Sequence, residues 1–120
     1  MLHDIGKVFE YETGVIIGFT TAGNLLGHIP IGAKLVQDKI DGLEGFPEIL
    51  KNKIIHMILS HHGSRGLGSP VEPLFPEAVT LHGIDSCDAS TKHAIQRKMR
   101  NLETTDEEFV WDERKLIYLK

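Results

Sequence analysis

The chain has 120 residues, of which 41% are apolar and 25% charged, as is typical of one globular domain. Its formal net charge of −4 argues against an electrostatic grip on nucleic acid over the whole surface. The sole cysteine, Cys87, excludes a disulfide within the chain, and the lack of a signal peptide or a membrane-length apolar run predicts a cytoplasmic protein without membrane contact.

The N-terminal segment predicts a metal-ligand motif followed by a hairpin. A short apolar run leads directly into His3 and Asp4, and Lys7 follows about one turn later. Imidazole and carboxylate donors on adjacent residues can face one divalent metal where a helix ends or bends, and Lys7 is placed to hold an anionic group such as a phosphate. Aromatic and β-branched residues around a glycine turn predict a small hairpin over residues 8–19, and residues 20–24 predict a turn or the start of a helix.

Two helices are expected next. The first covers residues 26–40, because apolar side chains recur there at helical spacing. Pro30 is tolerated only in the first turn of such a helix, which places His28 near its N-terminus. The second helix begins at a proline, presents apolar side chains along one face, and ends at the neighbouring histidines His61 and His62.

The second half predicts a loop, a long helix and another hairpin. Residues 63–70 form a glycine-rich loop that contains Arg65, and loops of this kind often carry binding sites. The helix covers residues 76–99, and its spacing puts Asp85 on the same face as apolar residues. Burying a carboxylate there is costly unless it is paired or bound to a metal. Residues 108–119 look like the closing hairpin.

These elements predict an all-α fold, a helical bundle with small β-hairpins, as a single domain over residues 1–120. Helix ends and one inner helix face carry the potential metal ligands, which are His3, Asp4, His28, His61, His62 and Asp85. Mixed nitrogen and carboxylate donors suit Mn, Fe, Co or Zn. A purely structural reading is also open, since histidines stabilise helix ends and Asp85 could pair with Lys92 or Arg97.

The motifs together resemble a known family. Residues 3–7, His-Asp-Ile-Gly-Lys, are similar to the signature of the HD-domain metal-dependent phosphohydrolases. Further segments resemble the HD domain of one branch, the YhaM-type 3′→5′ exoribonucleases: residues 25–29, 56–63, 68–70, 81–85 and 88–89. The resemblance implies an HD-domain helical bundle with one or two divalent ions (Mn, Co, Fe, Zn or Mg). Its implied reaction is hydrolysis of phosphodiester or phosphomonoester bonds of RNA or nucleotides by a metal-activated water.

The resemblance also implies roles for single residues. Three of them look like primary metal ligands: His3, Asp4 and Asp85. Three more match the positions that hold a second ion: His28, His61 and His62. Asp4 would then bridge the ions as a catalytic residue, Lys7 would act in catalysis by contacting a substrate phosphate, and Arg65 would border the substrate path.

Two departures from the family pattern widen the functional prediction. HD proteins usually take a first ligand histidine from a helix upstream of the His-Asp pair, and YhaM-type proteins carry an N-terminal OB-fold for RNA. The sequence contains neither, so a shortened relative or a C-terminal piece is expected, with a homodimer covering the exposed face. The alternatives to an RNA hydrolase are a small-nucleotide phosphohydrolase and a non-catalytic metal-binding or interaction module that has lost the first histidine.

Overall fold

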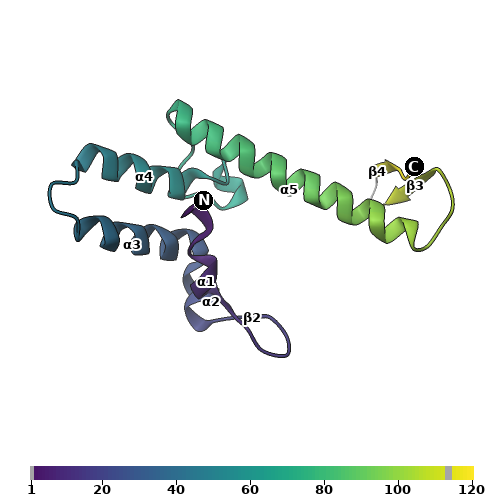
Figure 1. The fold of residues 1–120 in the computed structure, drawn as a ribbon, viewed down its shortest axis with the longest axis horizontal. Coiled ribbons are helices and arrows are strands. Elements are labelled where there is room, and N and C mark those ends of the chain that lie inside the picture. Colours follow the sequence, from purple (N-terminus) through teal and green to yellow (C-terminus); the bar gives the residue numbers. More distant parts are fainter. Residues whose placement is uncertain (1, 113–114) are drawn as a thin grey trace. The chain divides into compact units, whose positions relative to one another are not determined.

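The structure is a computed structural model that describes residues 2–112 and 115–120 (Figure 1). It divides into two compact units, Met1–Gly83 and Ile84–Lys120. The helices are η1 (Leu2–Asp4), α1 (Lys7–Glu10), α2 (Thr21–Leu26), α3 (His28–Asp41), α4 (Glu48–Ser60), η2 (Arg65–Leu67) and α5 (Pro76–Leu102), where η marks a 3-10 helix. The strands are β1 (Tyr11–Glu12), β2 (Gly18–Phe19), β3 (Phe109–Asp112) and β4 (Lys115–Tyr118). The predicted all-α class is confirmed, whereas the single domain over residues 1–120 stays a prediction.

The frame of the first unit is the helical hairpin of α3 and α4. The two helices lie side by side and run in opposite directions (Figure 1). Helix α3 begins at His28 with Pro30 in its first turn, and α4 ends at Ser60 with His61 as its C-terminal cap. Because the start of α3 and the end of α4 lie at the same end of this pair, His28 comes close to His61 and His62.

The segment with His3 and Asp4 packs directly on the backbone of α3. A Cβ atom at Gly6 would overlap the carbonyl group of His28, and one at Gly32 would lie 3.2 Å from the backbone nitrogen of Gly6. Two glycines therefore let η1 and α1 approach α3 more closely than side chains would allow. This approach brings Asp4 to the end of the α3–α4 hairpin where the histidines are.

The hairpin predicted over residues 8–19 is shorter than expected. Residues 7–10 form α1, so antiparallel pairing is confined to Tyr11 with Phe19 and Glu12 with Gly18. The aromatic and β-branched residues of this stretch favour a strand, but the side chain of Glu10 is buried against the start of α3. Tertiary contact thus overrides local propensity here.

Residues 20–24, expected as a turn or a helix start, begin a separate helix, α2. Its N-terminus is capped by Thr20, whose hydroxyl oxygen accepts a hydrogen bond from the Gly23 backbone N–H at 2.9 Å. Gly27, with a φ of 72°, then separates α2 from α3. The predicted helix over residues 26–40 consequently starts two residues later, at His28.

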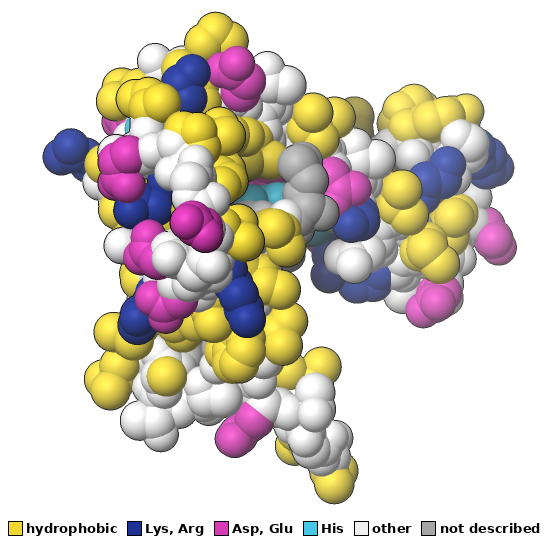
Figure 2. Space-filling view, turned by 60° about the vertical axis from the view of Figure 1, so that its left-hand side comes forward, with side chains coloured by type: hydrophobic (Ala, Val, Ile, Leu, Met, Phe, Trp, Pro, Cys, Tyr) yellow, Lys and Arg dark blue, Asp and Glu magenta, His cyan; other side chains and the backbone are white. Residues whose placement is uncertain are grey.

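The core of the first unit is small, and many large hydrophobic side chains are exposed. Its buried apolar residues are Ile29, Ala33, Ile40, Ile58, Ala78 and Leu81. Figure 2 shows hydrophobic side chains over much of the visible face. An apolar groove of about 430 Å³ runs between the N-terminal segment and the α3–α4 hairpin, with Leu2, Phe9, Leu43 and Phe46 among its lining residues.

The second unit consists of most of α5 and the closing hairpin that the sequence predicts. Strands β3 and β4 pair antiparallel from Phe109 with Tyr118 to Asp112 with Lys115. Asp112 ties the hairpin to α5, because its carboxylate accepts hydrogen bonds from Arg100 at 2.6 Å and from Asn101 at 2.8 Å. Among the helices that the structure describes, none combines the length and apolarity needed to cross a membrane.

Candidate metal centre

Asp4 lies at the centre of a cluster of histidines that come from separate elements. His3 and Asp4 belong to η1, His28 is the first residue of α3, and His61 and His62 follow α4. The Oδ1 atom of Asp4 lies 3.7 Å from His28 Nε2 and 3.6 Å from His61 Nε2, and its Oδ2 atom lies 3.6 Å from His3 Nε2. Donors scattered over sixty residues of sequence thus meet around one carboxylate.

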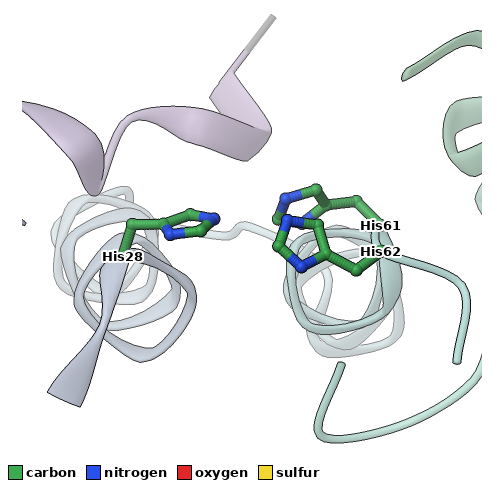
Figure 3. A group of neighbouring side chains, drawn as sticks. All are labelled: His28, His61 and His62. Carbon is green, nitrogen blue, oxygen red and sulfur yellow. The ribbon is translucent and has the colours of Figure 1, made fainter. Parts of the chain in front are cut away.

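The cluster contains two overlapping groups that could each hold a metal ion. One consists of His28, His61 and His62, and the other of His3, Asp4 and His61. Within each group the potential ligand atoms lie within 4.8 Å of one another, and His61 belongs to both. Figure 3 shows the rings of the first group pointing toward one another from the start of α3 and the end of α4.

Backbone carbonyl groups fix which ring nitrogen faces the cluster. His61 Nδ1 lies 2.7 Å from the Ile58 carbonyl oxygen, and His62 Nδ1 lies 2.9 Å from that of Leu67. A carbonyl oxygen can only accept, so Nδ1 of each ring carries the hydrogen and donates it. The Nε2 atom of a neutral ring then keeps its lone pair, which is the form that binds a metal.

Three acceptor atoms in the cluster are buried and have no hydrogen-bond partner among residues 2–112 and 115–120. They are Asp4 Oδ1, His28 Nε2 and His61 Nε2. A buried acceptor without a donor costs about 1–3 kcal/mol of folding free energy, and acceptors facing one another cannot satisfy one another. Divalent cations bind to lone pairs of this kind, so the residues present fit a metal ion with nitrogen and carboxylate ligands.

The protonation states of the cluster also favour a cation. Burial acts to raise the pKa of Asp4, but the hydrogen bond and the positive charge of Lys7 outweigh it and hold that pKa below its usual value. Burial lowers the pKa of His61, whose side chain is 0% exposed, and the neighbouring His62 and His3 lower it further. At neutral pH, Asp4 is therefore a carboxylate and His61 a neutral imidazole, as metal ligation requires.

The structure brings most of the predicted site residues together. Lys7 lies beside the cluster, where its Nζ donates to Asp4 Oδ2 at 2.7 Å, and its side chain is 43% exposed. Arg65 is exposed at the start of η2, just after His62 and Gly63. Asp85 lies on α5 within the second unit, and its role as a ligand stays a prediction.

Two further residues lie beside the cluster. The sequence predicts no role for Glu10 and only a general one for His82. Glu10 is buried, and its Oε1 contacts His28. Neither local spacing nor a motif links these residues, which are eighteen positions apart. His82, predicted as a core histidine or a supporting one, donates from Nδ1 to the His61 carbonyl oxygen at 2.9 Å. Its ring fills the space that a Cβ atom at Gly63, with a φ of 86°, would need.

Sequence comparison relates the chain to known proteins. The model of the HD domain family matches residues 1–90, the part of the chain that carries the cluster. The chain is also 42% identical over 91 residues to the 3′-5′ exoribonuclease YhaM of Geobacillus sp. (strain WCH70). That match covers 74% of this chain and 27% of the relative's length. No solved structure gives a significant match. On the family match and the resemblance to YhaM together, this chain belongs to the HD domain family.

Proposed function

We propose that this protein is a metal-dependent phosphohydrolase that cleaves phosphodiester or phosphomonoester bonds of RNA or nucleotides. The observation that carries the proposal is the set of buried acceptors Asp4 Oδ1, His28 Nε2 and His61 Nε2, which lack a donor in the described part of the chain. A divalent ion held there would supply a Lewis acid and make a water nucleophile available at neutral pH. Membership of the HD domain family supports the same chemistry.

The residues of the chain have separate tasks in this proposal. Asp4 and the histidines hold the ion, and backbone carbonyl groups have already oriented the rings of His61 and His62. The ammonium group of Lys7 has three N–H donors and donates one of them to Asp4, so two remain for the oxygens of a phosphoryl group. A fixed positive charge at that position would stabilise the negative charge that gathers on those oxygens in the transition state.

A hollow beside the cluster offers a place for the rest of the substrate. It has a volume of about 240 Å³ and is lined by His28 and His62 together with apolar residues, among them Leu26, Pro30 and Leu67. An apolar wall beside a polar reaction centre suits the base or sugar of a nucleotide, whose phosphate then faces the histidines. Arg65 begins the short helix η2, which ends at Leu67, and we place it at the border of this substrate path.

RNA is the first substrate to test, because the 42% identical relative is named a 3′-5′ exoribonuclease. The experiment incubates the full chain with Mn²⁺ and an RNA oligonucleotide labelled at its 5′ end, and in parallel with free nucleotides. Stepwise shortening from the 3′ end that is absent in Asp4→Asn would support an exoribonuclease. Turnover of free nucleotides alone would favour a small-nucleotide phosphohydrolase. Stoichiometric metal without either activity would favour the non-catalytic metal-binding module.

A further inference from the structure

We infer that Glu10 is a positioning residue of the metal centre, which holds the His28 ring so that its Nε2 atom faces Asp4. The inference rests on the metal centre of the proposed function and adds a residue to it. Glu10 Oε1 lies 3.3 Å from His28 Nδ1 and accepts a hydrogen bond from the His28 backbone N–H at 2.9 Å. One oxygen thus contacts both the ring and the backbone of the same histidine.

The ring contact fixes the tautomer and the direction of His28. A carboxylate oxygen accepts, so a neutral His28 ring carries its hydrogen on Nδ1 and keeps its lone pair on Nε2. That Nε2 atom is buried 3.7 Å from Asp4 Oδ1. His61 and His62 are oriented by carbonyl groups of their own segment, whereas His28 depends on a side chain eighteen residues earlier. A carboxylate in this place also makes the ring a stronger electron donor.

The backbone contact fixes the position from which the ring extends. His28 is the first residue of α3, after the cap residue Gly27, so its N–H has no partner within the helix. Glu10 accepts a hydrogen bond from this N–H. Its carboxylate also lies at the N-terminus of the helix, where the helix dipole stabilises a negative charge. The start of α3, and with it the Cα of His28, is thereby tied to the end of α1.

The way in which Glu10 is buried also indicates a role in the site. Its residue is 6% exposed, and its second oxygen, Oε2, is buried without a hydrogen-bond partner in the described ranges 2–112 and 115–120. A carboxylate that leaves one oxygen unsatisfied costs folding free energy. Folding stability alone does not explain a carboxylate in this position. A role in orienting the metal-ligand side chain of His28 does explain it.

The test compares wild type, Glu10→Ala and Glu10→Met with the control Glu12→Gln, which alters an exposed glutamate two residues away. Nitrogen-detected NMR of the histidine rings in metal-free protein should show His28 with its hydrogen on Nδ1 in wild type and in the control. In Glu10→Ala the ring should shift toward the other tautomer or a mixture. Glu10→Met keeps roughly the side-chain volume and removes both oxygens, so it serves if the alanine variant does not fold.

Metal binding provides a second readout, by titration of Mn²⁺ into each protein. We expect Glu10→Ala to weaken binding by about 10- to 100-fold and the control to leave it unchanged. In a His28→Ala background, the loss of Glu10 should weaken binding no further, because Glu10 acts through that ring. An unchanged His28 tautomer in folded Glu10 variants, or an equal loss of affinity in both backgrounds, would overturn the inference.

The two readouts also separate this inference from the proposed function. A tautomer shift in protein that hydrolyses neither RNA nor nucleotides would support the role of Glu10 while the proposed reaction fails. Hydrolysis that is unaffected by both Glu10 substitutions would overturn the role of Glu10 and leave the reaction standing.

Discussion

Asp4 is the residue whose substitution separates the metal-site interpretation from a structural one. We expect Asp4→Asn, which keeps the shape of the side chain, to be purified without stoichiometric metal and to lose hydrolytic activity, because a neutral amide beside His28 and His61 would bind a divalent ion far more weakly than a carboxylate does. Elemental analysis beside an activity assay measures both. Asp38→Asn is the matched control, since Asp38 is exposed and paired with Lys34. Full metal content in Asp4→Asn would contradict the prediction.

Lys7 should affect substrate more than metal. Lys7→Met removes two effects, a donor for a phosphoryl oxygen and the interaction that lowers the pKa of Asp4. We expect a fall of about 100-fold in kcat/KM. Because the pKa of Asp4 rises, metal binding should also weaken at a higher pH than in wild type when the solution is acidified. Kinetics and Mn²⁺ titration over a pH series test this. Lys34→Met, an exposed lysine with an equivalent aspartate partner, should change neither.

At the level of single residues, the sequence singles out the histidines and Asp4, which the structure brings together, but gives no indication of Glu10. His3, Asp4, His28, His61 and His62 occur in recognisable motifs at ends of predicted helices, and such ends meet in a bundle. Glu10 has no motif, and its partner His28 is set by how α1 docks on α3. A contact of this kind depends on tertiary packing, which no local pattern encodes. The role of Asp85 as a ligand stays a prediction.

Between elements, the contact of Gly6 with α3 should be the most sensitive to substitution. A Cβ atom in Gly6→Ala would overlap the His28 carbonyl group, so the segment must move away from α3. We expect a loss of about 1–3 kcal/mol in the free energy of unfolding, together with weaker Mn²⁺ binding. Chemical denaturation and metal titration measure these effects.

Gly83→Ala provides the control for that experiment. Gly83 lies in α5, and a Cβ atom there would meet nothing within 4 Å. Alanine is favoured over glycine in a helix by about 1 kcal/mol, so this variant should be as stable as wild type or more stable. If Gly6→Ala behaved like Gly83→Ala, the close approach of η1 and α1 to α3 would be refuted.

The closing hairpin should detach from α5 in acid. Hydrogen bonds from Arg100 and Asn101 hold the pKa of Asp112 below its usual value, although burial acts in the opposite direction. A carboxyl group with a lowered pKa stabilises the folded state fully above its unfolded pKa, and this stabilisation is lost as the pH falls through the lowered pKa. The backbone amide resonances of β3 and β4 should therefore shift in an acid titration by NMR, and Asp112→Asn should remove that transition.

Among the elements, the helices could be predicted more accurately than the short segments between them. α3, α4 and α5 have apolar periodicity and prolines at their starts, and the structure has them within a few residues of the expected bounds. α1 is too short for a periodic pattern, and its sequence favours a strand. It is helical because Glu10 is buried against α3. α2 begins after the cap residue Thr20. The sequence predicts only a turn or the start of a helix over residues 20–24.

For the whole molecule, the family match and the first compact unit end at similar positions in the chain. The HD domain model ends at residue 90, and the first unit ends at Gly83. The residues that the structure brings together at the candidate centre all belong to this first unit. The homodimer stays a prediction, which the molar mass from light scattering will test. A monomeric mass over the working concentration range would contradict it.

The sharing of His61 limits how the protein fills with metal. Its Nδ1 atom donates to Ile58, which leaves Nε2 as the one coordinating atom, yet both candidate groups include this residue. A lone pair serves one ion at a time, so the group filled second lacks a donor that the first has taken. We therefore expect anticooperative loading, with a binding isotherm broader than for one class of site and a Hill coefficient below one. Occupancy at cellular metal concentrations would then be graded rather than all-or-none.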